Sequence, residues 1–537
     1  MLKKLYANRL NIVAILTLAL LLVIMLCNAF PETFARLTYE LKEIANADSG
    51  LYYTVGKGIA NGLPAYSGLY ENKPPMIFLL SALSYKATDS FYSLNIMSFL
   101  CFVVIAILPT LLVICKGVKE KQSLISITSL SVFTLSISLL LANYAERQAG
   151  EVQTETFASV ALFFSIFAMS FGKTENSRIY SPHIIISGIF LGMATMFKEP
   201  FGIIGFITLL FFIKNPKDIL YKAVYPTLYA ILFFILLLLV TNSFIPYFTI
   251  YLSNMFGSHI SIYGSPFERS LNLFKLFNNL RSYTKVLEIL IYTLITINVC
   301  IYIFKMSQAD SLSKKIIHFL KIPLIFIALY ISSFNVGLGG QYFNHHYIFA
   351  LPFYGMLLFN TINFCIENAN QEKTKPYTFI FSIITAVITS LAFYNIIPFN
   401  GINNVPSDIE KAKEQAAYID KVLDVLKESK YQYLGFNGIQ AFTYTKHIPM
   451  GPAFAQDFRN FVNKDTYFAK EFVKQMNRAN VVVFRSFNVD VLNKKTLLTL
   501  DHCFTKQEPL SVETIRKPEK FPYQMYYRIK QDCNYYN

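Results

Sequence analysis

The sequence predicts a mainly α-helical, polytopic membrane protein that ends in a small extracytoplasmic α/β domain, and three observations lead to this fold class. Of the 537 residues, 54% are apolar and only 15% are charged, whereas a soluble protein has about 25% charged residues. Apolar stretches long enough to cross a bilayer recur through residues 1–395. Residues 396–537 differ, because they hold 20 Lys and Arg and 15 Asp and Glu. This composition excludes a disordered protein, a fibrous protein and an ordinary soluble enzyme.

Eleven membrane spans are expected in residues 1–395. Two short apolar stretches, 183–197 and 201–213, are expected to form a hairpin of abbreviated spans. Met76–Leu83 is too short to cross and is expected to lie on the membrane surface. The first long stretch shows no cleavage site after it, so it is interpreted as a retained helix. The nine stretches with the roughly 17–25 residues that a spanning helix needs are 10–30, 92–115, 123–142, 156–172, 221–243, 286–304, 316–334, 347–366 and 377–397.

Lys and Arg residues set the expected direction of these spans. With the N-terminus inside, the inner segments and the flanking Lys222 and Lys321 carry 17 Lys and Arg, whereas the short outer loops carry only Arg147 and Lys198. Positive residues collect in cytoplasmic loops, so the N-terminus is expected in the cytoplasm. After eleven spans, residues 396–537 are then outside. The net charge of +15 is attributed to this topology rather than to nucleic-acid binding.

Two long outer segments, 31–90 and 242–285, connect expected spans. Loops of this length are usually functional or disordered, and the first is rich in Tyr, Gly and Pro, so disorder is not expected. The last 142 residues alternate between helix and strand patterns, which is typical of a small α/β domain. The expected elements are a helix opened by the capping box Ser407–Glu410 and ending near Glu428, strands at Tyr431–Phe436 and Val481–Phe484, and a helix at Lys464–Ala479.

The seven cysteines show no paired spacing that would indicate a zinc or haem site. Five lie in or at the ends of expected spans, and Cys503 and Cys533 lie in the outer domain. Because disulfides persist in oxidising compartments, these two are expected to pair. A strand at Tyr523–Ile529 would carry Cys533 back to the domain. Two free thiols are the alternative, since the sequence does not place their Cα atoms within the ~7 Å that a bond needs.

The first outer segment contains the run ADSGLYYTVGKGIANGLPAYSGLYENKPP, which includes Asp48. A carboxylate held over an outward cavity is suited to act as a general base or a metal ligand. Asp is also a good helix N-cap, and a helical stretch follows this one. The residue type alone leaves both interpretations of Asp48 open.

The wider pattern resembles a known family. Asp48 is followed by Tyr52–Tyr53, by Gly62–Tyr66 (GLPAY) and by Lys73–Pro75 (KPP). This order is similar to the first outer loop of the GT-C glycosyltransferases, above all the bacterial branch related to protein O-mannosyltransferases and lipid A aminoarabinose transferases. The resemblance implies an inner-membrane enzyme that transfers a sugar, with inversion, from a polyprenyl-phosphate carrier to a lipid A, glycan or protein acceptor outside. Asp48 would take the proton of the acceptor.

The same resemblance implies further site residues. Family members carry a second acidic residue about a hundred residues after the first, and Glu155 follows Asp48 by 107 residues. It would face Asp48 across the cavity and assist it or bind the acceptor. Aminoarabinose transferases carry an acidic–Lys–Pro run in the first loop, but here Asn72 separates Glu71 from Lys73. Lys73 is therefore the expected ligand of the carrier phosphate, because this group needs a point cation.

Several of these residues have structural alternatives. Glu155 is also explained as a loop carboxylate that stabilises a helix N-terminus. Lys198 and Arg147 are further candidates for binding the donor phosphate, because charges at membrane depth usually face a cavity or a partner. A mutual pair of Lys198 with Glu199 explains the first of them equally well. Arg147 is otherwise a solvated loop residue.

Aromatic and histidine side chains complete the expected site. The sugar and acceptor cavity is expected to be shaped by Tyr52, Tyr53, Tyr66, His345 and His346. The alternative for the tyrosines is ordinary packing at the membrane interface. Adjacent His residues point in different directions on a helix, so a shared metal is not expected. His259 is a further metal or phosphate candidate, and the sequence leaves open whether any divalent metal is required.

Three rival functions require sequence features that differ from those of this chain. An oligosaccharyltransferase is excluded, because its Trp-Trp-Asp motif cannot occur in a chain without Trp. A lipid or sugar transporter commonly shows internal repeats and ionisable residues at mid-membrane, whereas here no repeat is evident and the unusual charges lie in outer loops. An O-antigen ligase or polymerase favours a large late loop, whereas this chain has its richest loop first. The expected partners are a lipid-linked sugar donor, a lipid or protein acceptor, and the bilayer.

Overall fold

The structure is a computed structural model, and it forms two compact units. It describes residues 47–149, 152–172, 179–256, 273–338, 342–368, 383–389, 391–392, 405–434, 441–452, 467–485, 494–506, 523–530 and 533–535, together with Leu16 and Leu20. Unit 1 comprises residues 1–39, 96–236 and 258–399, and unit 2 comprises residues 40–95, 237–257 and 400–537. The first outer segment thus groups with the C-terminal residues rather than with the spans.

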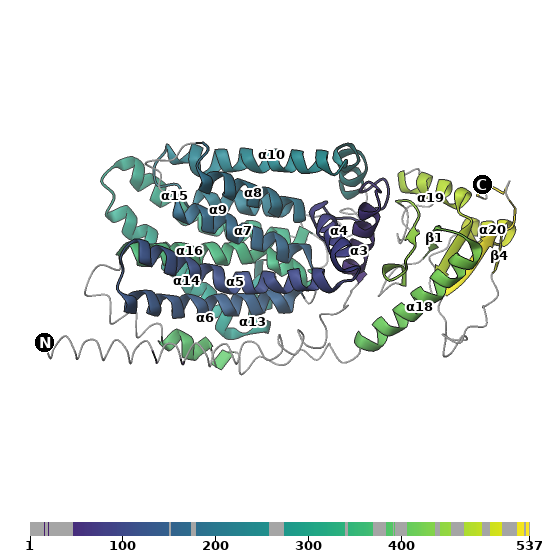
Figure 1. Cartoon of the computed structure of the whole chain (residues 1–537). Coiled ribbons are helices and arrows are strands. Elements are labelled where there is room, and N and C mark those ends of the chain that lie inside the picture. The colour runs from purple at the N-terminus through teal and green to yellow at the C-terminus, as the bar shows by residue number, and fades with distance from the viewer. Residues whose placement is uncertain are drawn as a thin grey trace. The chain divides into compact units, whose positions relative to one another are not determined.

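Unit 1 is built from long apolar helices that run side by side (Figure 1). Within the described residues, seven helices are long and apolar enough to cross a membrane. They are α5 (Tyr92–Lys119), α6 (Leu124–Ala149), α7 (Thr154–Phe171), η2 with α10 (Leu220–Val224 and Tyr225–Val240), α14 (Lys285–Ser307), α15 (Leu312–Leu338), and η6 with α16 (Asn344–Ala350 and Leu351–Asn368).

These helices confirm seven of the nine long spans that the sequence predicts. The predicted hairpin is also present, as the short apolar helices α8 (Pro182–Phe197) and α9 (Pro200–Leu210). The remaining two predicted spans, 10–30 and 377–397, fall largely outside the described residues. The total of eleven spans therefore stays a prediction.

Close packing in unit 1 depends on small residues between α8 and α10. A Cβ atom on Gly188 would lie 2.6 Å from the carbonyl oxygen of Pro226, and one on Gly192 would lie 2.9 Å from that of Ala230. The two glycines are four residues apart and so lie on one face of α8. Such small-residue pairs allow helices to approach closely in a membrane, where packing rather than the hydrophobic effect drives association.

Unit 2 contains the first outer segment as two packed helices, α3 (Ala47–Ala60) and α4 (Met76–Thr88). A Cβ atom on Gly56 would lie 2.6 Å from the backbone nitrogen of Ala82, so glycine permits their contact. The helix predicted at Met76–Leu83 is therefore present and has 13 residues. That length is shorter than the roughly 17 residues needed to cross a bilayer.

The C-terminal part of unit 2 is an α/β domain, as the sequence predicts. The five strands are arranged in the order β2-β1-β3-β5-β4, with β1 parallel to β2 and β3, and β5 antiparallel to β3 and β4. The elements are α18 (Val405–Leu426), β1 (Lys430–Leu434), β2 (Ile448–Pro449), α19 (Tyr467–Arg478), β3 (Val481–Arg485), α20 (Lys494–Cys503), β4 (Phe504–Lys506) and β5 (Tyr523–Arg528).

The predicted start of α18 is wrong by two residues. Helix α18 begins at Val405, so Ser407 lies inside its first turn rather than at the N-cap. The strands at 431–436 and 481–484, the helix at 464–479 and the strand at 523–529 are confirmed, each with its ends shifted by at most three residues. Helix ends are set by local hydrogen bonding that an apolar pattern does not reveal.

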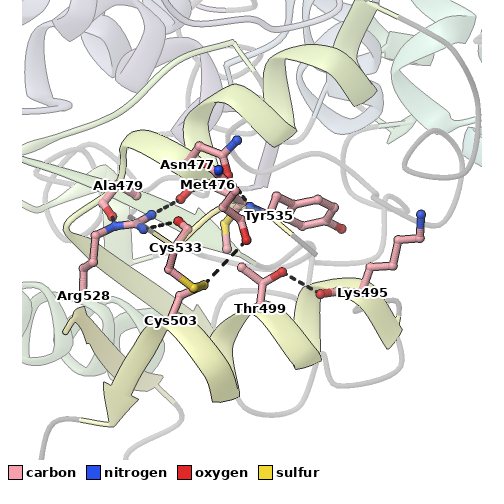
Figure 2. Close-up of a disulfide and its surroundings, with 10 residues drawn as sticks. Met476, Asn477, Ala479, Lys495, Thr499, Cys503, Arg528, Cys533 and Tyr535 are labelled. Carbon is pink, nitrogen blue, oxygen red and sulfur yellow. Dashed lines mark hydrogen bonds between the residues drawn. A yellow bond between two sulfur atoms is a disulfide. The ribbon is translucent and has the colours of Figure 1, made fainter. Parts of the chain in front are cut away.

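A disulfide joins Cys503 and Cys533, with their Cα atoms 5.4 Å apart, which confirms the predicted pairing. Figure 2 shows how the tail is held beside this bond. The guanidinium of Arg528 donates hydrogen bonds to the carbonyls of Met476, Ala479 and Cys533. The disulfide ties the segment that follows β5 to α20, and the hydrogen bond from Arg528 to Cys533 ties it to β5.

Replacement of both Cys503 and Cys533 by Ser is expected to lower the free energy of unfolding of the domain by about 3–4 kcal/mol in the chain-entropy model. The reason is that the bond closes a loop of sequence separation 30. Pulse proteolysis of the full chain in detergent, at increasing urea, measures this change. Non-reducing peptide mapping with thiols blocked at lysis tests the bond itself. Recovery of both cysteines as alkylated free thiols would contradict it.

Candidate active site

In unit 1, the site is centred on Glu155. This residue lies in the first turn of α7, where a carboxylate is stabilised by the helix dipole, and its side chain is 0% exposed. Nζ of Lys198 lies 3.1 Å from its Oε1, and the hydroxyl of Thr154 donates to its Oε2 at 3.0 Å. Lys198 is the residue at which α8 ends. The turn of the short hairpin thus brings a cation to a buried carboxylate.

His345 and His346 join the same group. Both belong to η6, a 3-10 helix that leads into α16 and packs against α7. One ligand atom each of Glu155, His345 and His346 lie within 4.8 Å of one another. The expectation that adjacent His residues diverge does not hold here. The two rings cross almost perpendicularly, with centroids 4.5 Å apart, and a nitrogen of each lies within 4.8 Å of a Glu155 carboxylate oxygen.

Arg147 lies near the end of α6, where its guanidinium packs on the ring of Tyr283. Its guanidinium carbon is 5.8 Å from the ring centroid of Tyr283. The hydroxyl of Tyr283 in turn donates to Oδ1 of Asn143 at 2.5 Å. Glu155, Lys198, His345 and His346 are therefore the predicted site residues that the structure brings together in unit 1.

In unit 2, the predicted site residues lie on α3 and on the loop that follows it. Asp48 is half-buried in the first turn of α3, and Tyr52 follows one turn later. Nζ of Lys73 lies 5.6 Å from the ring centroid of Tyr52 and 3.9 Å from Oε1 of Glu71. The Lys73 side chain is 15% exposed. Asp48 thus lies on α3, and Lys73 contacts the same helix through Tyr52.

The predicted tyrosines pack inside unit 2. Tyr66 has a positive φ of 68°, a conformation that costs energy for a side chain of this size. Its hydroxyl donates to the carbonyl of Lys73 at 3.0 Å. The ring of Tyr66 lies 5.1 Å from that of Tyr251 and 6.1 Å from that of Tyr247. Tyr66 is therefore held by two tyrosine rings, and it in turn holds the backbone of Lys73.

Tyr53 belongs to a second aromatic group on α3. Its ring centroid lies 4.3 Å from that of Phe91 and 6.2 Å from that of Tyr85. Burial raises the pKa of its hydroxyl above the ordinary value, so the group stays protonated. All three predicted tyrosines are buried, and the structure shows them as packing residues around Lys73 and α4.

One contact that sequence reasoning missed holds α3 against the C-terminal domain within unit 2. Nζ of Lys57 donates to the carbonyl of Thr445, and burial lowers the pKa of Lys57. The carboxylate of Asp420 accepts the backbone N–H groups of Lys446 and His447. Lys57 and Thr445 are 388 residues apart, and no local pattern predicts a pair at that separation.

The predicted site residues are therefore divided between the two units. Asp48 and Lys73 lie in unit 2, whereas Glu155 and Lys198 lie in unit 1. His259 lies outside the described residues. The group in each unit combines a carboxylate with a lysine. A carboxylate can move a proton, and a lysine can bind an anion.

Replacement of Lys198 by Met is expected to destabilise unit 1 by roughly 3–5 kcal/mol, the cost of breaking a buried ion pair. The reason is that the fully buried carboxylate of Glu155 would lose its 3.1 Å contact with an ammonium group. Thermal unfolding of the purified chain in detergent measures the effect. The double variant Glu155→Gln, Lys198→Met is expected to recover most of the loss.

The matched control is Lys314→Met. Lys314 contacts Asp310 at 2.9 Å, but both side chains are more than a third exposed, so its loss is expected to change stability by at most about 1 kcal/mol. A Lys198→Met protein as stable as this control would show that the buried pair does not support the fold.

Comparisons with known proteins agree with this architecture. Residues 72–243 match the family model for dolichyl-phosphate-mannose-protein mannosyltransferase, a range that includes Lys73, Glu155 and Lys198. Among curated protein sequences, none matches the chain.

A solved structure is similar over almost the whole chain. It is the crystal structure of ArnT from Cupriavidus metallidurans bound to undecaprenyl phosphate, with a TM-score of 0.50 and 10% sequence identity over 95% of this chain and 98% of that one. At this identity the likeness shows the fold. The chain therefore has the polytopic membrane fold of that structure, and the resemblance predicted from its first outer segment is confirmed.

Proposed function

We propose that this protein is a membrane glycosyltransferase that moves a sugar from a polyprenyl-phosphate carrier to an acceptor outside the cytoplasm. The observation that carries the proposal is the family match over residues 72–243, whose description names a dolichyl-phosphate sugar donor. The solved structure of similar fold holds undecaprenyl phosphate. Both relatives handle a sugar carrier of the same chemistry, a long isoprenoid joined to one phosphate. A transporter or an O-antigen ligase or polymerase would leave the family match unexplained.

The proposed reaction is a single inverting displacement. An oxygen of the acceptor attacks the anomeric carbon, the bond from that carbon to the phosphate oxygen breaks, and polyprenyl phosphate leaves. Asp48 takes the proton of the attacking group. Asp48 is half-buried in the first turn of α3, and a carboxylate within reach of the acceptor is the group that a general base requires.

Lys73 is proposed to stabilise the departing phosphate, where negative charge grows in the transition state. Its backbone is held by the hydroxyl of Tyr66, which donates to its carbonyl, and by Pro74 and Pro75 after it. Its ammonium lies between the ring of Tyr52 and the carboxylate of Glu71. These neighbours hold the cation in place before the donor binds, so less ordering is required on binding.

Lys198 is proposed as a second cation for the donor phosphate, with Glu155 as its positioning residue. The contact of 3.1 Å between them sets the direction of the lysine side chain. Glu155 is also proposed to bind the acceptor or to assist Asp48, and His345 and His346 to line the acceptor cavity. Arg147 is the third phosphate candidate. The inner membrane of a bacterium is the proposed location, with the N-terminus in the cytoplasm.

Asp48→Asn is expected to reduce sugar transfer by about 10²–10⁴-fold, the contribution of a general base. The assay supplies a lipid extract that contains polyprenyl-phosphate sugars, and mass spectrometry measures the polyprenyl phosphate released by the purified protein. Asp89→Asn is the matched control, because Asp89 is exposed in the same outer segment and its left-handed φ of 46° suits Asn. Turnover by Asp48→Asn equal to that of the control would remove Asp48 from the mechanism.

Lys73→Ala is expected to raise the KM for the lipid-phosphate donor more than Lys73→Arg does, because Arg keeps a cation at the same position. Lys86→Ala serves as the control, since Lys86 is an exposed cation in the last turn of α4. Donor titrations of the three variants give the comparison. If both Lys73 variants match the Lys86 control, Lys73 does not bind the carrier phosphate.

A reporter that is active only outside the cytoplasm is expected to be active when it is fused after Asn537. It should be inactive in the 116–122 loop, which the charge bias of the inner segments places in the cytoplasm. Activity of the loop fusion would show instead that Met76–Leu83 crosses the membrane. Equal expression of the two fusions, measured by immunoblot, is the control.

A further inference from the structure

Three potential metal ligands from two elements of unit 1 converge at one point. Glu155 comes from the first turn of α7, and His345 and His346 come from η6. One ligand atom from each lies within 4.8 Å of the others. Glu155 is fully buried and His346 is 6% exposed, so the group is largely shielded from water. None of the comparisons assigns a metal to these residues.

We propose that Glu155, His345 and His346 form a binding site for one divalent transition-metal ion of the zinc type. Two imidazoles and one carboxylate are the ligand set of many zinc sites that keep a fourth position open. Imidazole nitrogen favours zinc, cobalt and related ions, whereas magnesium and calcium favour oxygen alone. With bonds of about 2.0–2.2 Å, tetrahedral ligand atoms lie roughly 3.3 Å apart, so small side-chain rotations close the site.

The surroundings orient these ligands. The hydroxyl of Thr154 holds Oε2 of Glu155. The ring of Phe343 is stacked on His345 at 5.6 Å between centroids, and its edge meets His346 at 5.5 Å. Groups that fix the direction of the ligands strengthen metal binding in known sites, and an apolar shell restricts access of water. Thr154 supplies the first of these features.

The ammonium group of Lys198 competes with a metal ion for Glu155. This group lies 3.1 Å from Oε1 of Glu155, so a metal ion and the ammonium compete for one carboxylate. The Lys198 side chain is 18% exposed and has a route to solvent when the ion binds. Removal of this ammonium is therefore expected to tighten metal binding, which is the opposite of what loss of a ligand does.

Protons also compete with the ion. An imidazole binds a metal ion in its neutral form, so affinity is expected to fall as the pH is lowered, with release of protons on binding.

The test uses the full-length protein in detergent, with any affinity tag removed and metals stripped by a chelator. Titration with Co²⁺ is followed by its visible d–d absorption, and Zn²⁺ is then added as a competitor. The expected result is one Co²⁺ per chain, displaced by Zn²⁺. Glu155→Gln, His345→Ala and His346→Ala should each weaken binding by more than the roughly 10–100-fold that loss of an outer-shell partner costs.

Two further variants sharpen the result. His318→Ala removes an imidazole of α15 that stacks on Tyr302, and it should bind Co²⁺ as the wild type does. Lys198→Met should bind Co²⁺ more tightly than the wild type. If a ligand variant does not fold, the wild-type stoichiometry and its displacement by Zn²⁺ still decide. Absence of one-to-one binding by the wild type, or unchanged affinity in all folded ligand variants, overturns the site whether or not the protein transfers sugars.

Discussion

A fully buried carboxylate organises unit 1. Glu155 lies at the start of α7. Of the seven candidate spanning helices, α7 is the most buried, with 83% of its apolar stretch buried. A charge at this position is costly unless a cation or strong hydrogen bonds accompany it. Lys198 supplies the cation. It lies in the turn between α8, which ends at Phe197, and α9, which begins at Pro200. The short hairpin, the start of α7 and the turn of η6 are thus arranged around one carboxylate.

In unit 2, packing contacts hold the loop that carries Lys73 and the helix that carries Asp48 in place. The described loop around Lys73 packs on buried tyrosines, two of them from residues 237–257. Helix α3 is tied to the C-terminal domain through Lys57 and Thr445, and the disulfide closes that domain. The domain thereby stabilises the position of α3, the helix that carries Asp48. A catalytic group works best when such neighbours fix its geometry.

The sequence predicted well whatever depends on local pattern. The length of apolar stretches located seven long helices and the short hairpin, and the alternation of patterns after residue 396 located the sheet. The disulfide followed from elimination, because Cys503 and Cys533 are the two cysteines beyond the expected spans. Lys73 and Glu155 were found through the order of motifs rather than through any single residue.

The sequence did not predict what depends on packing between distant segments. It offered Glu199 as the partner of Lys198, whereas the structure shows Glu155 at 3.1 Å. Helical geometry predicted that the side chains of His345 and His346 point in different directions. In the structure their ring centroids are 4.5 Å apart. The contact between Lys57 and Thr445 had no signal at all. These pairs form only when the helices have been brought together in three dimensions.

The most direct measurement of the central claim is mass spectrometry of the cell. A deletion strain is compared with the same strain carrying the wild-type gene, for both surface glycans and extracted polyprenyl-phosphate sugars. The account predicts that deletion removes one sugar from an extracytoplasmic acceptor and that the matching lipid-linked sugar accumulates. Unchanged acceptors together with an unchanged pool of lipid-linked sugars would contradict it.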